Sequence, residues 1–286
     1  MEKIDTLVAV RQQLEQLGEH PMLSCLPTGF KAWDQLTGGL VRGGVTMIAG
    51  RPGMGKTALA LNIVNHLSQR LEGNIAVLSP ADNEQTMSMR ILRIGTKTEL
   101  SDLLRDSRSR TEATGKFRQF FQAQKGNILT HWMFDPTLED IYETCYQIPD
   151  LQLLVVDNPE AICEPAAQYN ANIEMIPRRL PMKTILLAMN SLAMQLDIPI
   201  LTTAHLHRSL EWRPDKHPRI HDLKKIGVPL ELLDQLVLLY RHSYYRVDCK
   251  DNITQCHIAK TCFGQPGTVH LAFQPEIECY QDLCDG

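Results

Sequence analysis

From residue 26 onward, short apolar runs alternate along the chain with longer stretches in which apolar residues recur every three or four positions. The short runs are typical of buried strands, and the longer stretches are typical of amphipathic helices. The predicted strands cover residues 45–49, 75–78, 128–130, 151–156, 198–203 and 235–240. The predicted helices cover residues 57–71, 84–94, 101–125, 138–147 and 184–196, with a short one near 230–233. This alternation predicts an α/β fold with a mainly parallel sheet and helices on both faces.

Three regions depart from the alternation. Residues 255–260 and 268–273 predict a terminal hairpin, and residues 159–181, which contain four prolines, predict an irregular surface loop. Residues 1–18 place apolar side chains on one stripe of a predicted helix that ends at Gly18. A helix this short cannot bury its stripe alone, so it should dock on its own domain or on a neighbouring subunit. We therefore divide the chain into an N-terminal helix, residues 1–20, and one α/β domain, residues 21–286.

Composition narrows the class of protein. The 286 residues are 43% hydrophobic and 22% charged, with a formal net charge of -4, so nucleic-acid binding would need a local basic patch. The N-terminus is charged and polar, and no apolar run is long enough to cross a bilayer. We expect a cytoplasmic protein without a membrane partner, in which the eight cysteines are free thiols.

A phosphate-binding motif follows the first predicted strand. Residues 50–57 read G-x-x-x-x-G-K-T and lead into a predicted helix, the order of elements that this motif requires. Its backbone N–H groups and the helix N-terminus would hold the phosphates, Lys56 would contact the β- and γ-phosphates, and the Thr57 hydroxyl would bind Mg²⁺. The alternative, a glycine-rich turn before an ordinary helix, explains fewer of the matched positions. The predicted ATP-binding residues are Gly50, Arg51, Pro52, Gly53, Met54, Gly55, Lys56, Thr57 and Ala58.

Asp157 ends the apolar run at residues 151–156. In enzymes with such a loop, an Asp at a strand end holds Mg²⁺ beside the phosphates. Alone, an Asp here would more simply cap the following turn. Together with the phosphate loop, it favours a metal site formed by Thr57 and Asp157.

Four further segments carry a family resemblance. Residues 26–40 resemble the segment before the phosphate loop in RecA-like motors, and the Arg-Pro-Gly-Met core of the loop resembles that of DnaB-type replicative helicases. Residues 207–218 are similar to that family's N-R-S-L-E-x-R-x-D-K-R-P segment, and residues 260–269 to its K-x-R-N-G-x-x-G-T-V segment. Asp222-Leu223-Lys224 resembles its D-L-R. The resemblance covers roughly residues 26–275, and the stretch before it resembles the family's linker helix.

This resemblance implies a RecA-like P-loop NTPase fold and a ring, usually a hexamer, with ATP and Mg²⁺ at each subunit boundary. Single-stranded DNA would pass through the centre. The loop after D-L-R contacts DNA in the family, which here assigns that role to Lys224, Lys225 and Gly227. Cationic and N–H groups suit contacts to phosphates that do not depend on sequence. Without the resemblance, the two lysines would be an ordinary solvated pair.

The chain departs from the family at three positions of the catalytic site. The family's catalytic Glu is replaced by Ala81, and Asp82, one residue along, is a doubtful substitute because its side chain should point the other way. The arginine finger, which acts in trans, is replaced by Cys262, which leaves Lys260 as a weak candidate for its role. His205 occupies the position of the family's phosphate-sensing Gln. Together with Lys56 and Asp157, these residues form the candidate catalytic set.

Three functions remain open on the sequence. The chain could be a working DnaB-like motor in DNA replication or related DNA metabolism. It could be a degenerate paralogue that binds nucleotide and assembles with another replication protein as a regulator. A RecA-like ATPase of the recombination or clock type is disfavoured by the segment at residues 207–218. Because both replaced groups act on the transition state, we expect weakened hydrolysis with binding retained.

Overall fold

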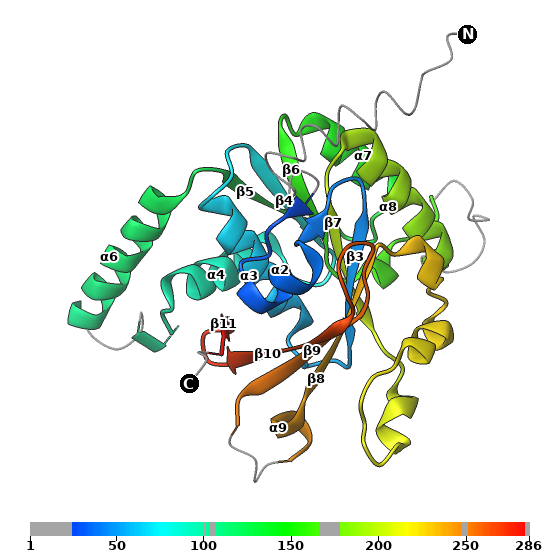
Figure 1. Ribbon diagram of the computed structural model, residues 1–286. Helices are drawn as coiled ribbons and strands as arrows, with labels where there is room; N and C mark the ends of the chain where they lie inside the picture. Colours follow the sequence, from blue (N-terminus) through cyan, green and yellow to red (C-terminus); the bar gives the residue numbers. More distant parts are fainter. Residues whose placement is uncertain (1–24, 100, 103–106, 166–177, 247–250, 284–286) are drawn as a thin grey trace, which may run out of the picture.

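The computed structural model describes residues 25–99, 101–102, 107–165, 178–246 and 251–283. A nine-stranded sheet runs through this part of the chain in the order β11-β10-β9-β8-β3-β7-β6-β4-β5 (Figure 1). The strands from β8 to β5 pair in parallel, whereas β9, β10 and β11 extend the sheet antiparallel. The predicted mainly parallel sheet is thereby confirmed. The N-terminal helix predicted within residues 1–18 lies outside the described residues.

The parallel strands are β3 (Val45–Gly50), β4 (Asn74–Ser79), β5 (Asn127–Trp132), β6 (Leu151–Val156), β7 (Ile200–His205) and β8 (Gln235–Arg241). The antiparallel strands are β9 (Ile253–Lys260), β10 (Gly267–Gln274) and β11 (Cys279–Asp282). A separate two-stranded sheet pairs β1 (Cys25–Leu26) with β2 (Leu40–Val41). The predicted hairpin is therefore present, and a third strand, β11, continues it.

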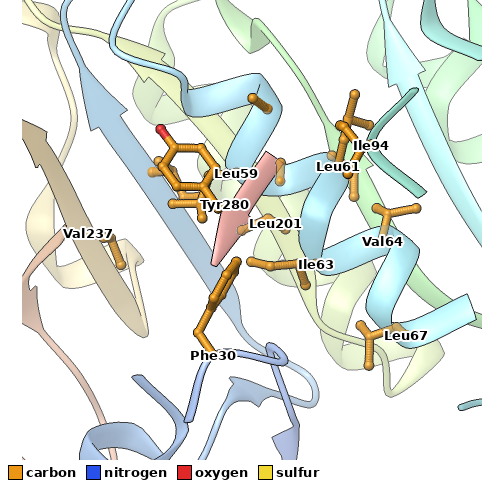
Figure 2. Packing of buried hydrophobic residues seen from close by; sticks show 14 of the residues in the cluster. Phe30, Leu59, Leu61, Ile63, Val64, Leu67, Ile94, Leu201, Val237 and Tyr280 are labelled. Carbon is orange, nitrogen blue, oxygen red and sulfur yellow. The ribbon is translucent and has the colours of Figure 1, made fainter. Parts of the chain in front are cut away.

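Helices cover both faces of the sheet. One face carries α2 (Lys31–Thr37), α3 (Lys56–Ser68) and α4 (Glu84–Thr96), with α6 (Ser107–Ala123) adding Phe120 to the same core. Figure 2 shows part of this layer, with Leu59 and Ile63 of α3 near the rings of Phe30 and Tyr280. The other face carries α7 (Leu138–Gln147) and α8 (Met182–Leu196).

Local sequence explains several of these boundaries. Helix α7 begins at a capping box, in which Thr137 and Asp140 satisfy each other's backbone N–H groups. The side chain of Asn83 accepts a hydrogen bond from the Thr86 N–H at the start of α4. Helix α8 follows Pro181, which cannot continue a preceding ladder.

The segment before β3 is fixed by buried polar contacts. Asp34 of α2 accepts hydrogen bonds from the Thr28 N–H and hydroxyl and from the Gly29 N–H. The indole N–H of Trp33 donates to Gln235 of β8 at 3.0 Å, and both side chains are fully buried. These contacts tie the segment that resembles RecA-like motors to the sheet.

Some sequence predictions differ from the structure in extent. The helix predicted over residues 101–125 is observed as α6, which begins at Ser107. Helix α2 and strand β11 were not predicted, because each is too short to show a clear period. The stretch between β7 and β8 contains the 3₁₀ helices η3 (Arg208–Trp212), η4 (Ile220–Ile226) and η5 (Leu230–Leu232), and the short helix α9 (His242–Tyr245) follows β8.

The proline-rich stretch at residues 159–181 begins with the short helix η1 (Pro159–Ala161). Cys163 then forms bridges to Thr137 and Arg179. Residues 166–177 lie outside the described part. None of the helices in the described residues is long and apolar enough to cross a membrane.

Candidate nucleotide-binding site

The phosphate loop connects β3 to α3 at the carboxyl edge of the parallel strands (Figure 1). Gly53 and Gly55 have positive φ angles of 77° and 94°, a region that residues with a Cβ rarely adopt. A Cβ on Gly55 would also collide with the hydroxyl of Tyr280. Local conformation and packing therefore both require glycine at the turn into α3.

A cavity of about 300 Å³ opens at this loop. Of the predicted ATP-binding residues, Gly53, Gly55, Lys56, Thr57 and Ala58 line it. Its other walls come from α4, β7, β8 and the β10–β11 region, and consist of Arg90, His205, Arg241, Phe273, Pro275 and Glu278. The cavity thus combines a glycine-rich floor with cationic side chains, as an anionic ligand requires.

The remaining loop residues hold the loop in place. The Arg51 guanidinium pairs with Glu211 at 2.8 Å and donates to the Leu206 carbonyl at 2.8 Å. Met54 is buried in the core, and Pro52 is exposed. Gly50 pairs with His205 across β3 and β7. The predicted contribution of Arg51 to binding is therefore indirect in this structure, through the segment that contains Glu211.

Lys56 points into the site with only 4% of its surface exposed. Its Nζ donates to the Arg51 carbonyl at 3.2 Å. Burial lowers the pKa of Lys56 to about 8, opposed by the charges of Asp157 and Glu160 and reinforced by that of Arg51. A bound triphosphate would add negative charge and hold this ammonium in its protonated form.

Thr57 and Asp157 lie in contact, as predicted from their positions after β3 and β6. The Thr57 hydroxyl is 3.0 Å from both carboxylate oxygens of Asp157, and the Thr203 hydroxyl donates to the same carboxylate at 2.8 Å. Burial raises the pKa of Asp157, against the hydrogen bonds from Thr203 and Thr57 and the charges of Arg90 and Lys56. A hydroxyl beside a carboxylate is the hard oxygen donor set that suits Mg²⁺.

Asp82 does not face the site as a free base. Its carboxylate pairs with Arg90 at 2.5 Å, and the same guanidinium binds Glu278 at 2.8 Å. The Ala81 position beside it is exposed and carries no polar side-chain atom.

His205 lies at the end of β7, on the wall of the cavity. Its backbone N–H donates to Glu160 Oε1 at 2.7 Å, and its ring Nδ1 lies 3.9 Å from the same oxygen. Partial burial, followed by the charges of Lys56 and Arg51, lowers the pKa of His205 to about 4. The imidazole is therefore neutral at pH 7 and can still exchange a hydrogen bond with a phosphate.

The position of the family's finger lies on β9 and the turn after it. Lys260 Nζ donates to the carbonyls of Leu230 at 2.9 Å and Leu233 at 2.5 Å. The exposed Cys262 thiol lies 3.2 Å from a carboxylate oxygen and from the carbonyl oxygen of Asp234. Burial, followed by the hydrogen bond and charge of Asp234, raises the pKa of Cys262 to about 11. Within one chain, neither residue presents a free cation.

The predicted DNA-contacting residues lie at the end of η4. Lys224 is exposed, Lys225 donates to the Ser209 hydroxyl at 2.8 Å, and Gly227 caps the helix with a φ of 69°. The helix is fixed from inside by the buried Asp222, whose carboxylate lies 2.6 Å from Arg213.

Sequence reasoning missed Arg241 and Phe273, which line the cavity from β8 and β10. The Arg241 guanidinium lies 4.9 Å from the centre of the Phe273 ring and donates to the Gly53 carbonyl at 3.1 Å. Glu160 was also missed. No local motif marks these residues, because strand pairing and the turn after β6 bring them to the loop.

Comparison with known proteins accounts for this arrangement. A family model described as "DnaB-like helicase C terminal domain" matches residues 25–282. The chain belongs to this family. Relatives include the "Replicative DNA helicase DnaB" of Geobacillus stearothermophilus, 29% identical over 98% of this chain, and the "Replicative DNA helicase DnaC" of Bacillus subtilis (strain 168), 27% identical over the same share. This chain spans 61% of the length of each.

Solved structures agree with the family. One of them, an isolated ATPase domain, superposes with a TM-score of 0.83 at 25% identity, covering 99% of this chain and 100% of the other. A structure titled "The Structure Of A DnaB-Like Replicative Helicase And Its Interactions With Primase" superposes with a TM-score of 0.77 at 25% identity, over 99% of this chain and 67% of the other. The DnaB-family domain therefore has the RecA-like α/β fold that the sequence predicted.

Proposed function

We propose that this DnaB-family domain binds ATP with Mg²⁺ and acts on single-stranded DNA in DNA replication or related DNA metabolism, with weakened hydrolysis. In this proposal the chain works in the cytoplasm as a ring, usually hexameric. The observation that carries the proposal is the complete phosphate-gripping set beside an incomplete hydrolytic set: Lys56, Thr57 and Asp157 converge at one cavity, whereas Ala81 and Cys262 stand where the family has its base and finger.

Three features support ATP binding. The buried Lys56 supplies a cation at the floor of the cavity, Thr57 and Asp157 supply oxygen ligands for Mg²⁺, and the loop glycines hold the strained turn. On the wall of the cavity, the Arg241 guanidinium and the Phe273 ring present flat surfaces suited to stacking on a base.

Energetics support slow hydrolysis. In related phosphoryl transfers an arginine finger contributes about 10³–10⁵ in rate. General acid–base assistance contributes about 10²–10⁴ more. The two losses do not multiply fully when the groups act as a unit. Nonetheless, a chain that lacks both at their usual positions should turn over slowly without a compensating group.

A second candidate is a degenerate paralogue that binds nucleotide and regulates or assembles with another replication protein. The position of Lys260 favours it, because this ammonium is held by two carbonyls of its own chain and is poorly placed to replace a finger in trans.

The two candidates separate in one pair of assays. Binding of a fluorescent ATP analogue with Mg²⁺ should be abolished in Lys56→Ala and retained in Lys183→Ala, a change on the exposed face of α8. Steady-state hydrolysis is then measured with and without single-stranded DNA. Slow turnover that DNA accelerates and Lys56→Ala abolishes supports the motor. Tight binding without turnover supports the paralogue, and no binding by the unmodified chain would refute both.

A further inference from the structure

The site lacks a carboxylate at the position of the family's base, but four others lie around it. Asp82 and Glu278 both pair with Arg90, and Glu278 also pairs with Arg93. Asp157 is taken up by the hydroxyls of Thr57 and Thr203. Each of these three carboxylates is engaged in a charge pair or in the predicted metal site.

Glu160 is the fourth carboxylate and differs from the rest. Its Oε1 accepts a hydrogen bond from the His205 backbone N–H at 2.7 Å. Its Oε2 is buried and has no hydrogen-bond partner among the described residues, although the side chain as a whole keeps 32% of its surface exposed. A buried carboxylate oxygen without a donor is uncommon, because its desolvation is uncompensated. This oxygen is available to a small donor.

The turn after β6 brings Glu160 to the phosphate site. Asn158 adopts a φ of 54°, and its N–H donates to the Thr203 hydroxyl at 2.9 Å, so the chain bends immediately after Asp157. Glu160 then contacts His205, which lines the cavity together with Lys56. The Glu160 carboxylate is close enough to Lys56 for its charge to raise the pKa of that ammonium, against burial.

We propose that Glu160 takes the place of the missing base at Ala81 and orients the attacking water through Oε2. This inference rests on the proposed function, since it requires ATP in the cavity. The water oxygen bonds to the γ-phosphorus while the bond from that phosphorus to the bridging oxygen of the departing diphosphate breaks. The proton of the water passes to Glu160 Oε2, and the products are ADP and inorganic phosphate.

The test is single-turnover hydrolysis of γ-labelled ATP with protein in excess, together with ATP affinity. Glu160→Gln retains an oxygen for the His205 backbone N–H and removes the basic carboxylate. We expect its rate to fall on the order of 10²-fold with affinity unchanged. Glu139→Gln, an exposed carboxylate in the first turn of α7, is the matched control and should retain the rate. Ala81→Glu in the Glu160→Gln background should recover part of the activity.

Other results would overturn the inference. An unchanged rate in Glu160→Gln would exclude Glu160, and a reduced rate in Asp82→Asn alone would assign the role to Asp82. A circular dichroism spectrum and an ATP affinity equal to those of the unmodified chain exclude misfolding of the variant. Absence of hydrolysis by the unmodified chain with ATP still bound would refute Glu160 as a base and leave the proposed binding function standing. Absence of ATP binding would refute both.

Discussion

The side chains around Lys56 show how burial and neighbouring charges set the chemistry of the cavity. Lys56 is almost fully buried next to Asp157, and both have pKa values shifted toward their neutral forms by burial. The charges of the two residues oppose this shift in each other. A ligand that carries several negative charges and a divalent cation would relieve the cost of burying both groups. The site is therefore built for an occupied state.

His205 provides a test at this scale. Its pKa of about 4 lies below the usual 6.5, because of partial burial followed by the charges of Lys56 and Arg51. Since the folded pKa is the lower one, neutral His205 favours the folded state above pH 6.5, and this contribution disappears as pH falls toward 4. We expect its ring resonance to stay constant between about pH 8 and about pH 6 in NMR spectra, and its pKa to rise when ATP binds.

The resonance of His205 is assigned by its disappearance in His205→Gln, which retains a hydrogen-bonding side chain. A midpoint near the usual 6.5 in the free protein would contradict the expected effect of burial and of the two cations.

Helices, strands and turns place the functional groups along one edge of the sheet. The phosphate loop follows β3, Asp157 follows β6 and His205 ends β7. Because β6 and β7 pair in parallel, and β7 pairs in parallel with β3, their carboxyl ends meet at this edge. The predicted DNA-contacting turn at the end of η4 follows β7 and η3 along the chain. Arg51 joins these regions through its contacts to Leu206 and Glu211.

The turn at the end of η4 can be tested through its charges. In the double variant Lys224→Ala/Lys225→Ala, affinity for single-stranded DNA should fall in a sequence-independent way. The slope of log affinity against log salt should decrease by about 0.7 for each phosphate that the turn no longer binds. Fluorescence anisotropy of a labelled oligonucleotide at several salt concentrations measures both. Lys183→Ala on α8 is the control, and an unchanged slope in the double variant would exclude this turn from DNA binding.

At the level of the whole molecule, one chain does not complete the hydrolytic site. Cys262 faces Asp234 of its own chain, and Lys260 is bound to its own carbonyls. In the proposed ring, these positions belong to the boundary between subunits, where the family resemblance places the finger. Assembly is therefore the property on which we expect activity to depend most.

Residues 1–18 provide a test of assembly. Their apolar stripe has no core of its own, so its removal should lower the mass of the assembly in the presence of ATP and Mg²⁺. Light scattering with and without single-stranded DNA measures that mass. A sharper variant, Leu7→Ser/Leu14→Ser, interrupts the stripe and should act like the deletion, whereas Gln13→Ser/Gln16→Ser should not. An unchanged mass after deletion would show that the stripe does not serve assembly.

The sequence by itself determined the order of the main strands and helices, the phosphate loop and its metal partner. These features depend on local periodicity and on fixed spacings within a motif, which a linear pattern records. The family resemblance added the expected positions of Ala81, Cys262 and His205. Short elements such as α2 and β11 escaped prediction, because they bury few side chains in any regular period.

Only the tertiary structure decided which charged groups meet. Arg90 takes up Asp82, while Arg241 and Phe273 reach the phosphate loop from β8 and β10. Glu160 comes to His205 through the bend after β6. Such pairings depend on strand order and on the direction of a turn, and hydrogen-bond partners far apart in the sequence leave no periodic signal. Thus the linear pattern indicated a nucleotide site, and the fold brought to it the carboxylate that we propose acts there.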